Sequence, residues 1–247
     1  MSTRAHDIYD PMVKAGKTVL ILRIVMIIFS WFPILIIALF PTVPNTVIGI
    51  FGQSSIVFSW ISTLLLLIFL HINFKNMDSD TRISSENKQR IKLGGILSLI
   101  LIIILSLYAI LYFVFYILYI ELGVITISLT FGNIIGWVII VLEIFNGILF
   151  IIVFVVLNKI FRNFENLGEF RFLVKFVLLY GIFTGIGHLL VASSALFLAL
   201  PISNLTLLTI FGTVITSLPI VLNLAGLFGI ILSIGFILIG RRLQSTQ

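Results

Sequence analysis

Two ionisable residues, Glu143 and His188, lie deep within long apolar runs of this sequence. An ionisable side chain at bilayer depth is costly unless it faces protein or water, so it is the first candidate for function in a membrane segment. A carboxylate beside an imidazole can share a proton, and coupled pairs of this kind serve as proton relays. The same pair can also join two helices through a hydrogen bond alone, which is the structural alternative.

The two residues are predicted to meet because they lie at the same depth of consecutive, antiparallel helices. Glu143 follows Phe131, where its apolar run begins, by as many positions as His188 precedes Leu200, where the next run ends. At 1.5 Å per residue, both lie ~18 Å from the same boundary. A short connection between the two runs favours contact between the side chains.

Three further polar residues belong to the predicted intramembrane polar site. Asn146 lies three positions after Glu143 and therefore shares its helical face. Thr63 and Asn223 lie at equal distances before and after Glu143 in the sequence, at matching positions of an internal repeat. The site is thus predicted to combine these three residues with Glu143 and His188. No residue of the set is assigned a catalytic role.

The composition defines the class of protein. Of the 247 residues, 60% are hydrophobic and only 10% are charged, whereas soluble domains carry about 25% charged residues. A run of ~20 apolar residues crosses a bilayer, and six runs are long enough. We therefore predict an all-α polytopic protein that forms a single membrane domain. The spans are placed near residues 18–40, 47–73, 93–120, 131–158, 173–200 and 207–240.

The cations predict the orientation of these spans. All 15 Lys and Arg residues lie in or near the two termini and the connections 75–92 and 159–175, and none lies in the other three connections. Because Lys and Arg accumulate on the cytoplasmic side, both termini are predicted to be cytoplasmic in a cell membrane. Arg23, a little over one helical turn into the first span, is expected to extend its long side chain back to the interface.

A constant spacing between similar residues suggests an internal repeat. Phe-Gly pairs occur at 51–52, 131–132 and 211–212, and Thr46, Thr126 and Thr206 keep the same register. This register predicts three helical hairpins. The number of two-helix units is similar to that of the mitochondrial carriers, but the Pro-x-acidic-x-x-basic motif of that family is absent from the first helix of each hairpin. The chain is therefore not assigned to it.

Two G-x-x-x-G motifs predict places where helices pack closely. Gly132 and Gly136 form one, and Gly181 and Gly185 form the other. Small residues at this spacing let two helix backbones approach each other, so we interpret both motifs as packing surfaces.

The remaining residues argue against several classes of function. The sequence has no Cys, its three His residues are scattered, and it lacks a nucleotide-binding loop and a nucleophile motif. We therefore expect no metal, no cofactor, no nucleic-acid partner and no enzymatic activity. A small ion- or proton-coupled transporter or channel is the first hypothesis. A non-catalytic membrane subunit or scaffold is the alternative, with the lipid bilayer and another membrane protein or further copies of the chain as partners.

Overall fold

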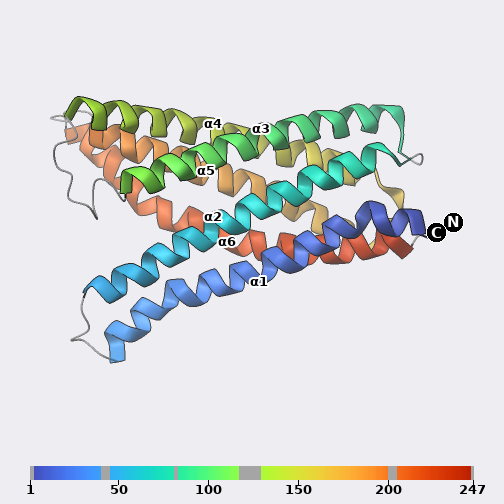
Figure 1. The fold of residues 1–247 in the computed structure, drawn as a ribbon, viewed down its shortest axis with the longest axis horizontal. Helices are drawn as coiled ribbons and strands as arrows, with labels where there is room; N and C mark the ends of the chain where they lie inside the picture. Colours follow the sequence, from blue (N-terminus) through green and yellow to red (C-terminus); the bar gives the residue numbers. More distant parts are fainter. Residues whose placement is uncertain (1–2, 40–44, 81–82, 117–128, 200–204, 246–247) are drawn as a thin grey trace.

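The protein is a bundle of long helices in the computed structural model (Figure 1), which describes residues 3–39, 45–80, 83–116, 129–199 and 205–245. The described residues contain no strand, so the predicted all-α class is confirmed. The elements are α1 (Thr3–Leu39), α2 (Asn45–Asp78), α3 (Ser85–Tyr116), α4 (Leu129–Arg162), a short 3-10 helix η2 (Glu165–Leu173), α5 (Val174–Ala199) and α6 (Leu205–Ser245).

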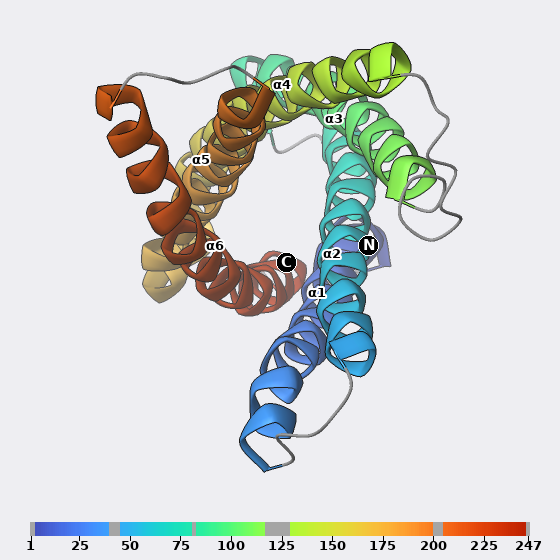
Figure 2. The same cartoon turned by 90° about the vertical axis from the view of Figure 1, so that its left-hand side faces the viewer.

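The six long helices form a ring in chain order. Each packs against its neighbours in the sequence, and α6 closes the ring by packing against α1. Figure 2 looks along the bundle and shows the helices placed around a common centre. The α1–α2 hairpin diverges from the other four helices towards the end of the bundle where α1 ends and α2 begins (Figures 1 and 2).

Five of these helices contain described stretches that are long and apolar enough to cross a membrane. The stretches are Val57–Asp78, Ser85–Tyr112, Gly136–Arg162, Leu167–Phe197 and Thr216–Ser245. In α1, the apolar run 18–40 includes residues whose side chains lie outside the described part of the structure. The chain is a membrane-spanning helical protein. The three-hairpin repeat stays a prediction, and most of the Phe-Gly and Thr positions that suggested it lie outside the described side chains.

The first helix begins well before the predicted span. It starts at Thr3, not near residue 18, and the polar N-terminal segment forms its first turns. Tyr9 and Met12 are almost wholly buried there, at 1% and 2% exposed. The Tyr9 hydroxyl donates a hydrogen bond of 3.2 Å to the Asp80 carboxylate, which ties α1 to the end of α2. Burial of this apolar face accounts for the additional length.

The apolar core fills one end of the bundle, the end that contains both chain termini. Its largest wholly buried side chains come from all six long helices: Tyr9, Met12, Leu66, Leu67, Phe74, Met77, Ile91, Phe150, Phe154, Phe161, Tyr180 and Phe236. The described Lys and Arg residues other than Arg23 lie in helix ends and connections at this same end. The basic end is therefore also the tightly packed end.

Glycines allow α4 and α5 to approach closely. A Cβ placed on Gly185 would lie 2.6 Å from the carbonyl oxygen of Gly147, and one placed on Gly181 would collide with Phe154. The packing role predicted for Gly181 and Gly185 is therefore confirmed. At Gly136 no atom of the described structure lies within 4 Å of an added Cβ, so the packing role predicted there stays a prediction. The side-chain environment of Gly132 lies outside the described residues.

Candidate functional site

The Glu143 carboxylate and the His188 imidazole are in direct contact. Oε2 of Glu143 lies 2.5 Å from Nδ1 of His188, and Glu143 is only 2% exposed. The close passage of Gly147 past Gly185 lies one turn away on each helix, so it holds the two side chains together. The contact predicted from equal depth is therefore present. Phe150 stacks against the imidazole at 5.3 Å between ring centroids and fixes its plane.

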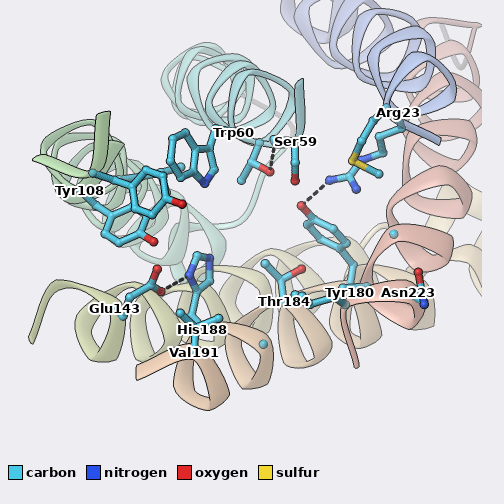
Figure 3. Close-up of a pocket in the computed structure, with 18 residues that line it drawn as sticks. Arg23, Ser59, Trp60, Tyr108, Glu143, Tyr180, Thr184, His188, Val191 and Asn223 are labelled. Carbon is cyan, nitrogen blue, oxygen red and sulfur yellow. Dashed lines mark hydrogen bonds and ion pairs between the residues drawn. The ribbon is translucent and has the colours of Figure 1, made fainter. Parts of the chain in front are cut away.

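This pair faces a central cavity of about 460 Å³ (Figure 3). All six long helices contribute lining residues, so the cavity lies inside the ring and not at a seam between two helices. Two of its lining residues on α6, Leu222 and Asn223, are exposed. On the side of the basic end it meets the apolar core, to which α2 contributes Leu66 and Leu67.

Aromatic residues form the wall opposite the pair. Tyr108 on α3 lies next to Glu143, and Trp60 on α2 lies beside Tyr108 (Figure 3). The Trp60 ring meets Tyr108 and Tyr112 edge to face, with centroid separations of 5.7 and 5.0 Å. Aromatic packing of this kind restrains the Tyr108 side chain. The carboxylate of Glu143 is therefore hydrogen-bonded to α5 and lies next to a tyrosine of α3.

Arg23 also lines the cavity, contrary to the expectation from sequence. Its side chain is only 4% exposed and does not extend to the interface. The guanidinium donates a hydrogen bond of 2.7 Å to the Tyr180 hydroxyl, and its carbon lies 5.0 Å from the centroid of the Tyr180 ring. The face of α1 that carries Arg23 points into the ring, so the long side chain follows the interior and not the membrane surface.

One face of α5 connects the two ionisable groups. Tyr180, Thr184 and His188 follow at intervals of four positions, so all three project to the same side of the helix and line the cavity. Figure 3 shows Thr184 between the other two. The buried Thr184 hydroxyl has no hydrogen-bond partner among the described residues. The face therefore leads from the Arg23 guanidinium to the Glu143 carboxylate.

The other predicted site residues take different positions. Thr63 lines the cavity, but its hydroxyl donates to the Ser59 carbonyl at 2.9 Å. Asn223 lines the cavity on α6, away from Glu143 (Figure 3). Asn146 is wholly buried outside the lining, and its amide has no hydrogen-bond partner among the described residues. The structure thus places Glu143, His188, Thr63 and Asn223 on one cavity and excludes Asn146 from it.

Sequence reasoning missed Arg23, Tyr180, Thr184, Tyr108 and Trp60. The i, i+4, i+8 spacing of Tyr180, Thr184 and His188 was a readable signal, because it places three polar groups on one face of an apolar helix. The signal at Arg23 was weaker, because the sequence gives its depth in the span but not whether its side chain points into the bundle or towards the membrane surface.

In the described parts of the chain, no group of three or more His, Asp or Glu side chains can hold a metal ion. The fold and the cavity define the class of a multi-pass helical membrane protein with a polar, charged centre. Comparison with protein-family models, with curated proteins and with solved structures finds no match to the chain.

Proposed function

We propose that this protein is a small proton-coupled transporter whose central cavity binds the solute and whose Glu143–His188 pair binds the proton. The observation that carries this proposal is the position of the pair. It lines a cavity to which all six helices contribute, so a proton bound there is within reach of any solute in the cavity. No nucleotide-binding segment occurs in the sequence, so an ion gradient is the proposed source of energy.

The packing of the bundle supports a state of such a transporter that is closed at one end. Buried apolar side chains from α1 to α6 fill the basic end, whereas the α1–α2 hairpin diverges at the opposite end. Alternating access requires a cavity that opens to one face at a time. The observed form is proposed to be closed on the basic side.

The orientation in the membrane is a separate proposal. The positive-inside rule applied to the basic end places both termini and the connections 79–84 and 163–173 in the cytoplasm. Because the chain has no Cys, a single Cys at Ser84, which is exposed, gives an unambiguous label. The residue should react with an impermeant thiol reagent only after the membrane is opened. Labelling of intact cells would place this end outside.

The scaffold hypothesis remains the second candidate because the pair also joins α4 to α5. A Glu–His hydrogen bond at this seam contributes to helix association whether or not protons move. In that case another membrane protein, or further copies of the chain, would use the outer surface of the bundle. The two hypotheses differ in what a conservative change at Glu143 does.

The experiment compares wild-type protein with Glu143→Gln in lipid vesicles that contain a pH-sensitive dye. Gln keeps the shape and the hydrogen-bonding capacity of Glu but cannot titrate, so proton flux should fall to the level of empty vesicles. Glu169→Gln is the matched control, because Glu169 is an exposed carboxylate of η2. It should leave flux unchanged.

Thermal unfolding of the same samples separates function from folding. Glu143→Gln should unfold within a few degrees of wild type, since the contact with His188 can persist as a neutral hydrogen bond. Equal flux in Glu143→Gln and wild type would eliminate the proton-coupling role. Wild-type flux no greater than that of empty vesicles, for protons with a panel of small solutes, would favour the scaffold hypothesis.

A further inference from the structure

We propose that the solute of this cavity is a small anion, bound through a carboxylate or phosphate group by the guanidinium of Arg23. The inference names the class of solute for the proposed transport function. Binding of the anion is independent of that function, whereas its passage across the membrane rests on it. It assigns Arg23 as the substrate-binding residue and the Glu143–His188 pair as the site of a proton that accompanies the anion.

The first argument is the missing counter-charge at Arg23. The guanidinium is always protonated and is 4% exposed, yet its bond of 2.7 Å goes to the neutral Tyr180 hydroxyl. Its Nε has no hydrogen-bond partner among the described residues. None of the ion pairs between described residues includes Arg23. A buried cation is normally paired, because desolvation of an unpaired charge is costly. An anionic solute supplies the missing partner.

The second argument is that the bundle makes room for the guanidinium. Gly229 of α6 lies directly against it, and a Cβ at this position would collide with the guanidinium carbon and with two of its nitrogens. Only a glycine here leaves the group space against the α6 backbone. A planar guanidinium held in a fixed orientation suits bidentate binding of a carboxylate or phosphate. Arg23 is thus held for recognition on the wall of the cavity.

The size and lining of the cavity limit the solute. About 460 Å³ falls in the range of small-molecule sites. In addition to the guanidinium, the Thr184 hydroxyl, which has no hydrogen-bond partner among the described residues, offers a further hydrogen bond. Met26 and Leu105 supply apolar contacts. The lining therefore fits a small organic or inorganic anion better than an uncharged or cationic solute.

The third argument concerns charge balance with the proton site. The ionisable groups next to Glu143 are His188 from α5 and Tyr108 from α3. Tyr112 lines the same cavity beside Tyr108, and Arg23 is the other charged residue of the lining. When the pair holds no extra proton, Glu143 and Arg23 make the lining neutral. When the pair gains one proton, the lining carries one positive charge, and one bound anion neutralises it. Proton binding and anion binding should therefore favour each other reciprocally.

The test measures thermal unfolding of the purified, detergent-solubilised protein with the sodium salts of chloride, phosphate, acetate, lactate and benzoate. Each salt is used at the same ionic strength on wild type and on Arg23→Met, so that general salt effects cancel. At least one anion should raise the melting temperature of wild type in a saturable manner, and the shift should vanish in Arg23→Met. The neutral analogue acetamide should have no effect.

Two further variants keep the test decisive if Arg23→Met does not fold. Arg23→Lys retains a cation without the planar fork and should bind the same anion at least tenfold more weakly. Gly229→Ala displaces the guanidinium and should weaken binding without a change in charge. Saturable shifts with none of the anions, or equal shifts in wild type and these variants, would overturn the proposal.

The linked proton gives a second readout. In the pH range where the pair takes up its proton, the affinity for the anion should rise about tenfold per unit fall in pH. In Glu143→Gln this dependence should flatten. A pH-independent affinity in wild type would overturn the proton linkage, and anion binding without any flux would overturn the transport function alone. Glu143-dependent proton flux without an anion shift would overturn the anion site alone.

The anion has two sources, a soluble solute and a phospholipid headgroup. Mass spectrometry of lipids that remain bound to purified wild type and Arg23→Met distinguishes them. An anionic lipid that is retained by wild type and lost from Arg23→Met would support the anion site and assign it to a headgroup. Equal lipid content with a saturable anion shift would support a soluble solute.

Discussion

Two ionisable sites face the same cavity, and they are stabilised in opposite ways. Glu143 and His188 form a hydrogen-bonded pair across α4 and α5, so each side chain supplies the other's partner. Among the described residues, Arg23 has only a neutral hydrogen-bond partner, Tyr180, although it is buried as deeply as many core residues. The burial of Glu143 and His188 is consistent with a structural role or with a functional one. The burial of Arg23 is not explained by a gain in stability, because an unpaired buried charge lowers the stability of the fold.

The difference indicates which of the two sites would need a ligand under the proposed function. A pair that satisfies itself does not need a ligand, whereas a cation without a counter-charge does. The two sites also share α5, since His188 and Tyr180 come from the same helical face. A substitution in one site should therefore change the contribution of that site to stability and leave the other site, on the same helix, unaffected.

The largest expected effect follows from breaking the seam that holds the first site together. Gly185→Leu places a side chain against the Gly147 carbonyl, which is backbone and cannot move aside. The free energy of unfolding should fall by about 3 kcal/mol or more. Gly136→Leu is the control, because no atom of the described residues lies within 4 Å of an added Cβ there. Thermal unfolding and the yield of monodisperse protein are measured for both variants. Equal loss of stability in the two would contradict a special role for the close α4–α5 packing at Gly185.

The next effect measures the pair itself. A double-mutant cycle with Glu143→Ala and His188→Ala should give a coupling energy of about 1 to 2 kcal/mol, as expected for one strong hydrogen bond within a membrane bundle. The matched cycle of Glu143→Ala with Tyr180→Phe should give less than about 0.5 kcal/mol, because Tyr180 belongs to the other site. Coupling of equal size in both cycles would mean that the sites are not separate.

A smaller effect is expected at Tyr180. Tyr180→Phe removes the hydroxyl that accepts from Arg23, and it should lower the free energy of unfolding by about 1 kcal/mol. The same change made in an Arg23→Met background should cost close to nothing, since the donor is already gone. Unfolding curves of the four proteins provide the comparison. A cost that persists without Arg23 would show that Tyr180 acts through packing alone.

The smallest effect on stability should come from Arg23 itself. Arg23→Met replaces a buried, unpaired cation with an apolar, unbranched side chain, so the melting temperature should be unchanged or slightly higher. Glu143→Ala, which leaves His188 without its partner, should lower it. A loss of more than about 1 kcal/mol on Arg23→Met would show that the cation stabilises the fold and would remove the contrast between the sites.

The sequence was sufficient for the helices and for one of the two sites. Long apolar runs are governed by bilayer thickness, so their number and the equal depth of Glu143 and His188 follow from counting residues. The start of α1 was missed because the segment before residue 18 is polar on average, although Tyr9 and Met12 lie on its buried face. Composition alone does not reveal a buried face within a mixed segment.

Arg23 was missed for a different physical reason. Depth is readable from sequence, but rotation about the helix axis is not when apolar residues surround the helix on every side. A long cationic side chain near a helix end is stable in either direction, outward to the interface or inward to a polar centre. Only the positions of Tyr180 and Gly229 on two other helices decide between them.

Helix α5 sets a constant distance between Tyr180 and His188. Two intervals of four positions span about 12 Å along a helix axis, and this length does not change while the helix stays intact. Under the proposed anion binding, a solute whose anionic end is held at Arg23 reaches the imidazole only if it is long enough. Short and long homologues should then differ in whether they contact His188 directly. Selection by length would then be a property of one rigid helix and would need no adjustable loop.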